Sequence, residues 1–88
     1  MANTDKSKAL ITALKTAAVI ELYNPEDVSA WDRQAEAIRQ TLKGDAGLAD
    51  SVPHFVWHYL ADSDLRRKDT AYRAAQIDKL LEVIRGPF

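Results

Sequence analysis

Apolar side chains recur along this chain at the three- and four-residue spacing of an α-helix. Over residues 5–23 they form a stripe made of Leu10, Leu14, Ala17, Ala18 and Leu22, which Val19 and Ile20 widen near its end. A helix that is apolar over most of its girth is usually buried by several neighbours. We therefore predict a core helix over this range, with the edge at Val19 and Ile20 left over as surface.

A second helix is predicted over residues 25–43, behind a start signal at residues 24–27. Asn24 is a suitable N-cap, and Pro25 fits the first helical position, where its missing N–H has no consequence. The apolar positions of this helix form one narrow seam, made of Val28, Trp31, Ala35, Ile38 and Leu42. We expect Gly44 to end the helix in the left-handed conformation that glycine tolerates.

The densest apolar and aromatic segment predicts a third, short helix over residues 52–63. Ser51 is placed to cap this helix, and Pro53 lies in its first turn, where proline is tolerated. The expected core face contains Val52, Phe55, Val56, Tyr59 and Leu60, and a second face contains His54, Trp57, His58 and Ala61. A helix that is apolar or aromatic on two sides has surface left over for another contact.

A fourth helix is predicted over residues 69–85, with Asp69 as its cap. Its main stripe contains Ala74, Ile77, Leu81 and Ile84, and Leu80 and Val83 flank this stripe. Residues 45–50 are interpreted as a connection with Leu48 in the core, and residues 62–68 as a charged connector or a further turn of the third helix. Four helices predict an all-α fold, a compact bundle or an orthogonal array, in a single helical domain over residues 1–88.

Composition narrows the class of function. The net charge of −1, from 12 basic and 13 acidic residues, provides no overall field that favours nucleic acid or an anionic membrane. The absence of cysteine excludes disulfides, zinc–thiolate sites and cysteine catalysis, and it fits a cytoplasmic protein. No apolar run approaches the ~20 residues of a membrane span. The N-terminal segment lacks the apolar core of a signal peptide, so we expect neither a membrane anchor nor a secretion signal.

Signatures of catalysis are missing from the sequence. The chain has three glycines and no glycine-rich phosphate loop, and no serine has the context of a nucleophile elbow. A chain of this length is also short for a pocket of drug-like volume, roughly 300 Å³ or more. We therefore expect a non-catalytic protein that uses no cofactor.

Two histidines raise the question of a metal site. His54 and His58 are four residues apart, so on a helix their rings can face one cation, and Asp62 extends the row by another turn. Phe55 stands where the metalloprotease motif has its glutamate. The competing interpretation makes both histidines half-exposed rim residues beside a partly surface-packed Trp57. We favour the rim interpretation and predict no metal site.

The leftover apolar surface predicts protein–protein interaction, with another protein or with a second copy of this chain as a homodimer. Tryptophan is enriched at binding hot spots. The residues that we expect at or near the contact are Trp31, His54, Trp57 and His58. In the competing interpretation, the fold is tighter and both tryptophans belong to the core.

The alternative function is that of a nucleic-acid-associated regulatory protein. Its phosphate contacts would be Arg66, Arg67, Lys68 and Arg73, with Trp57 and Tyr72 as rings on which bases stack. Three aspartates surround this basic run and cancel much of its field, so nucleic acid is the less favoured partner.

Overall fold

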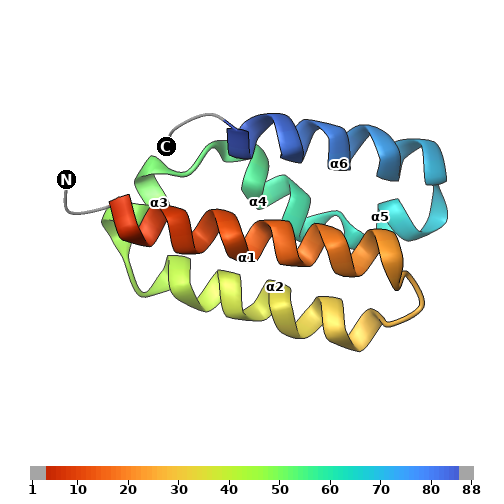
Figure 1. The fold of residues 1–88 in the computed structure, drawn as a ribbon, viewed down its shortest axis with the longest axis horizontal. Helices are drawn as coiled ribbons and strands as arrows, with labels where there is room; N and C mark the ends of the chain where they lie inside the picture. The colour runs from red at the N-terminus through yellow and green to blue at the C-terminus, as the bar shows by residue number, and fades with distance from the viewer. Residues whose placement is uncertain (1–3, 86–88) are drawn as a thin grey trace. The chain divides into compact units, whose positions relative to one another are not determined.

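The computed structural model describes residues 4–85, and all regular structure in that range is α-helical (Figure 1). The helices are α1 (Thr4–Tyr23), α2 (Val28–Lys43), α3 (Ala46–Ser51), α4 (His54–Ala61), α5 (Ser63–Lys68) and α6 (Thr70–Arg85). The prediction of an all-α fold is confirmed. The chain divides into two compact units, Met1–Ser51 and Val52–Phe88. That both belong to one domain stays a prediction.

The long helices follow the sequence pattern closely. The helices α1, α2, α4 and α6 coincide with the four predicted helices to within three residues at each end. The helices α3 and α5, of six residues each, occupy the segments interpreted as connections. Apolar periodicity therefore locates the long helices, whereas six residues are too few to show a period.

In the first unit, α1 and α2 lie side by side as an antiparallel hairpin (Figure 1). The buried apolar residues of the two helices are Leu10, Leu14, Ala17, Ala18, Trp31, Ala35, Ile38 and Leu42. The side-chain amide of Gln34 also donates a hydrogen bond of 3.0 Å to the backbone carbonyl of Ala13, which ties the two helices near their midpoints. The predicted stripes are thus confirmed except at their ends, where Leu22 and Val28 are exposed.

The helix α2 begins later than predicted, because its N-cap is Asp27 and not Asn24. The Asp27 carboxylate accepts a hydrogen bond of 3.0 Å from the backbone N–H of Ala30. The N–H of Asn24 instead donates to the carbonyl of Ile20 and so continues the pattern of α1. Gly44 follows the last residue of α2, but its φ of −82° makes the expected left-handed cap wrong.

Asp45 explains why α3 forms where a connection was expected. Its carboxylate accepts a hydrogen bond of 3.0 Å from the N–H of Leu48, which caps α3, and it pairs with the Lys6 ammonium at 2.7 Å. The Lys6 hydrogen bond, followed by that of Leu48, holds the pKa of Asp45 below its usual range. Leu48 is buried, as predicted. Ser51 ends α3 and donates to the carbonyl of Leu48, so its predicted role as the next helix cap is wrong.

In the second unit, α4 and α5 both pack against α6. The buried apolar residues are Val52, Val56, Tyr59, Leu60, Ile77, Leu80 and Ile84. The stripe of α6 is shifted from the predicted one, because Leu80, expected to flank the stripe, is fully buried, whereas Leu81 is half-buried and Ala74 is exposed. The predicted cap of α6 is confirmed: the Asp69 carboxylate accepts a hydrogen bond of 3.0 Å from the N–H of Tyr72.

The cap of α2 can be tested by substitution. We expect Asp27→Ala to lower the free energy of unfolding by ~1 kcal/mol, because the N–H of Ala30 loses its acceptor. The measurement is urea denaturation followed by circular dichroism. Asp27→Asn is the matched control, since its amide oxygen can still accept the bond. An equal loss in both variants would contradict the capping role.

Candidate functional site

The exposed side of α4 carries both histidines. The ring centroids of His54 and His58 are 4.7 Å apart, and the ring planes meet edge to face at 78°. Trp57, on the same helix, is half-buried. Trp31 belongs to the other unit and is only 4% exposed. Trp31 therefore fits the interpretation in which it is a core residue, and the exposed predicted contact residues are His54 and His58.

Asp62 follows α4 but does not complete a set of three metal ligands with the histidines. Its Oδ2 atom accepts hydrogen bonds from the Tyr72 hydroxyl at 2.8 Å and from Nε2 of Gln76 at 2.9 Å. The Gln76 bond, followed by that of Tyr72, holds the pKa of Asp62 below its usual range, and the same contact raises the pKa of Tyr72. Over residues 4–85, no three His, Cys, Asp or Glu side chains are grouped so as to hold a metal ion.

Arg66 is fully buried, which corrects the expectation that it belongs to an exposed phosphate-binding run. Its Nη1 atom donates to the carbonyl of Tyr59 at 2.6 Å and to Oε1 of Gln76 at 2.5 Å. Its guanidinium carbon lies 4.1 Å from the centroid of the Tyr59 ring, a cation–π distance. With 0% exposure, Arg66 is out of reach of an external phosphate and instead links α4, α5 and α6.

The other predicted phosphate contacts lie at or near the surface. Arg67 and Lys68 are exposed on α5, and Arg73 is half-buried in the first turn of α6. Arg67 pairs with the Asp64 carboxylate at 3.3 Å, one turn earlier. Two apolar side chains of the same segment, Leu65 and Tyr72, are also exposed. We call this surface the basic segment, defined as Leu65, Arg67, Lys68, Tyr72 and Arg73.

The largest exposed apolar side chains of the first unit gather where α1 ends and α2 begins. They are Val19, Leu22, Tyr23 and Val28, with exposures of 52%, 50%, 78% and 36%, and we call them the hairpin tip. Val19, Leu22 and Tyr23 share one helical face, because they are three and four residues apart. Apolar periodicity predicts an exposed edge at Val19 but a core position for Leu22, which the exposure of Leu22 contradicts. Residues 16–32 contain four carboxylates and no Lys or Arg, so the hairpin tip has an acidic setting.

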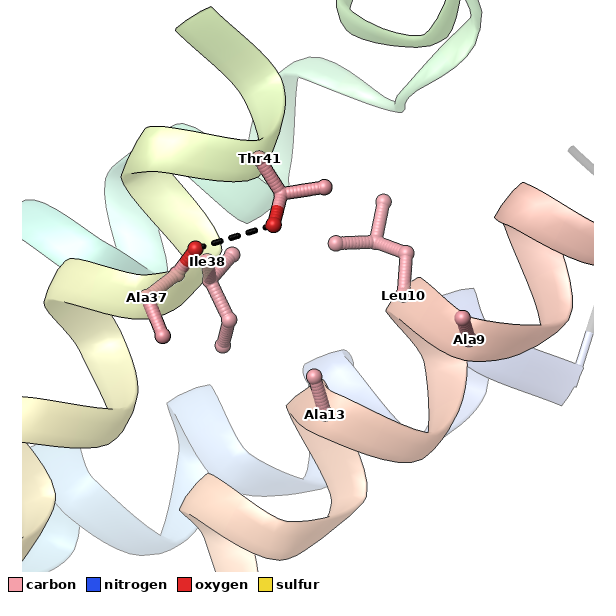
Figure 2. Close-up of a pocket in the computed structure, with 6 residues that line it drawn as sticks. All are labelled: Ala9, Leu10, Ala13, Ala37, Ile38 and Thr41. Carbon is pink, nitrogen blue, oxygen red and sulfur yellow. Dashed lines mark hydrogen bonds between the residues drawn. The ribbon is translucent and has the colours of Figure 1, made fainter. Parts of the chain in front are cut away.

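The described hollows do not suit a small-molecule ligand. One, of about 100 Å³, lies between α1 and α2, and Figure 2 shows its lining of Ala9, Leu10, Ala13, Ala37, Ile38 and Thr41. The hydroxyl of Thr41 is already donated to the carbonyl of Ala37, so it is not directed at a ligand. Another hollow, of about 420 Å³, is lined by residues of α6 alone, which offers no opposing wall. Ligand pockets are typically ~300–1,000 Å³ and enclose most of their ligand.

Comparison with models of protein families, with curated proteins and with solved structures found no match to this chain. Within residues 4–85, no helix has the length and the apolar character needed to cross a bilayer.

Because Arg66 is buried and Arg67 is exposed, we expect the two residues to contribute unequally to the free energy of unfolding. We expect Arg66→Ala to lower the free energy of unfolding by about 2–4 kcal/mol, because it leaves a cavity and two buried acceptors without their donor. Arg67→Ala is the control and should stay within about 0.5 kcal/mol, since Arg67 is exposed. Urea denaturation measures both. Similar losses in the two variants would show that Arg66 is not a core residue.

Asp62 predicts a pH dependence of stability. Its pKa is lower in the folded chain than the ~3.9 of an unfolded one, so its contribution is present above that value and is lost as the pH falls through the folded pKa. We expect the stability difference between the wild type and Asp62→Asn to be constant above about pH 5 and to shrink below about pH 4. Chemical denaturation across this range measures it, with Asp78→Asn as an exposed control. A difference that does not change with pH would contradict the role of the carboxylate.

Proposed function

We propose that this chain is a small helical protein that acts by protein–protein interaction, and that its partner is a second copy of itself. The observation that carries this proposal is the hairpin tip, where four large apolar side chains are exposed within a span of ten residues. Exposed apolar clusters on small proteins mark association surfaces. Tyr23, the most exposed of the four, belongs to a residue type that is enriched at binding hot spots.

Charge supports a second copy as the occupant of the hairpin tip. The tip is flanked by acidic residues, among them Glu26, which is exposed. The basic segment combines exposed apolar side chains with cationic ones. Arg67 is already paired with Asp64, so the cations of this segment that can meet an acidic tip are the exposed Lys68 and the half-buried Arg73, and every copy carries both surfaces. We therefore expect a contact in which the tip of one copy meets the basic segment of another.

The charge balance of the whole chain also favours contact between copies. With a net charge of −1, two copies repel each other very little at neutral pH. Ion pairs at the rim of such a contact weaken as salt rises, whereas apolar burial does not. We therefore expect an association that salt reduces but does not abolish. The nucleic-acid alternative has lost one of its four proposed contacts, because Arg66 is buried.

The first test is the solution mass, measured by light scattering on a sizing column at two protein concentrations. We expect the wild type to gain mass as the concentration rises. Leu22→Ser combined with Tyr23→Ser should raise the dissociation constant at least about tenfold, because it removes the apolar anchors of the tip. The matched control is Lys8→Ser, an exposed substitution on α1 outside the tip. A wild type that is monomeric at both concentrations would overturn the proposal.

Charge reversal tests the pairing of the two surfaces. Lys68→Glu places a carboxylate opposite an acidic tip and should weaken association. Combining it with Glu26→Lys should restore association, because the opposite charges then face each other again. If the combined variant is as weak as Lys68→Glu alone, the tip does not meet the basic segment.

A further inference from the structure

The imidazole rings of His54 and His58 are close together and exposed to solvent. They lie one helical turn apart on α4, and their centroids are separated by 4.7 Å. No hydrogen bond to another side chain or to the backbone of residues 4–85 engages either ring. A neutral imidazole carries one acceptor nitrogen and one N–H donor, so each of these exposed rings retains a nitrogen that can bind an external group.

The separation of the rings suits a single metal ion. Histidine nitrogens bind zinc at ~2.0–2.1 Å, so two of them on one tetrahedral ion are ~3.3 Å apart. Because a coordinating nitrogen lies on the side of its ring nearest the ion, rings with centroids 4.7 Å apart can reach this separation. The present edge-to-face angle of 78° requires one ring to turn, a motion that exposed side chains make within picoseconds to nanoseconds.

The local charge also suits a cation. The segment His54–Ala61 contains no Lys or Arg. The carboxylate of Asp62 follows directly, close enough that His58 contributes to the lowered pKa of Asp62. Its hydrogen bonds to Tyr72 and Gln76 hold this carboxylate in place beside the helix. A cation on the two rings would therefore lie within the field of a fixed negative charge.

We infer that His54 and His58 form a two-histidine binding site for a divalent transition-metal ion on the exposed side of α4. Imidazole ligands suit Cu²⁺, Ni²⁺ and Zn²⁺, and the general order of affinity places Cu²⁺ first. The sequence alone favoured rim histidines without a metal, and the ring separation and the availability of the nitrogens are what change this interpretation. Two protein ligands leave the other coordination positions to water.

Isothermal titration with ZnCl₂ and with CuCl₂ in a non-coordinating buffer tests the site. We expect saturable binding of one ion per chain, with Cu²⁺ tighter than Zn²⁺. His54→Gln and His58→Gln should each weaken binding at least about tenfold, because one ring alone forms no chelate. Asp50→Asn, which removes an exposed carboxylate from α3, is the control and should bind as the wild type does. Unchanged binding in the histidine variants, or no saturable heat, would overturn the inference.

Two further readouts separate this site from adventitious binding. Histidine ring protons report the site directly by NMR, since the chain has two histidines and both should shift together. An ion that binds the folded helix also raises the melting temperature, and this rise should vanish in the variant that carries both glutamines. The inference is independent of the proposed self-association. The Leu22→Ser, Tyr23→Ser variant should bind the ion normally, and a loss of binding there would overturn an α4 site.

Discussion

The free N–H groups at the start of a helix must find acceptors, and three aspartates meet this requirement along the chain. Asp27, Asp45 and Asp69 each accept a hydrogen bond of 3.0 Å from the backbone N–H three residues ahead. These carboxylates determine where α2, α3 and α6 begin. Because Asp27 directly precedes Val28 of the hairpin tip and Asp69 lies three residues before Tyr72 of the basic segment, these two caps fix the starts of α2 and α6, each of which carries part of a proposed contact surface.

The sequence predicts the long helices well because their apolar positions repeat over several turns. The sequence is a weaker guide to the exact start of a helix, where two nearby residues are both suitable caps, and to the burial of residues at a helix end. Asn24 and Asp27 are both good caps, and the turn that selects Asp27 is not visible in the spacing. Leu22 keeps the period of α1 yet is 50% exposed, because periodicity does not show how far the covering partner extends.

Prediction from the sequence is weaker still for the candidate contact surfaces, because it does not show which side chains are exposed. Arg66 and Arg67 are adjacent and chemically identical, yet one is fully buried and the other exposed. What separates them is Gln76, ten residues further on, whose Oε1 atom accepts from the Arg66 guanidinium. The sequence identified the histidine pair from its spacing alone, but the ring separation required the structure. Contacts between helices therefore determine whether a side chain is buried or exposed where the spacing of residues along the sequence does not.

The two tryptophans are divided between the two units, Trp31 on α2 and Trp57 on α4. Each unit thus contains its own indole, one of them 4% exposed and the other half-buried. Intrinsic fluorescence is therefore the sum of two reporters in different surroundings. Substituting either indole with phenylalanine would leave a spectroscopic probe of a single unit. Whether the two signals change together on denaturation is then a direct measure of whether the halves of the chain unfold as one cooperative body.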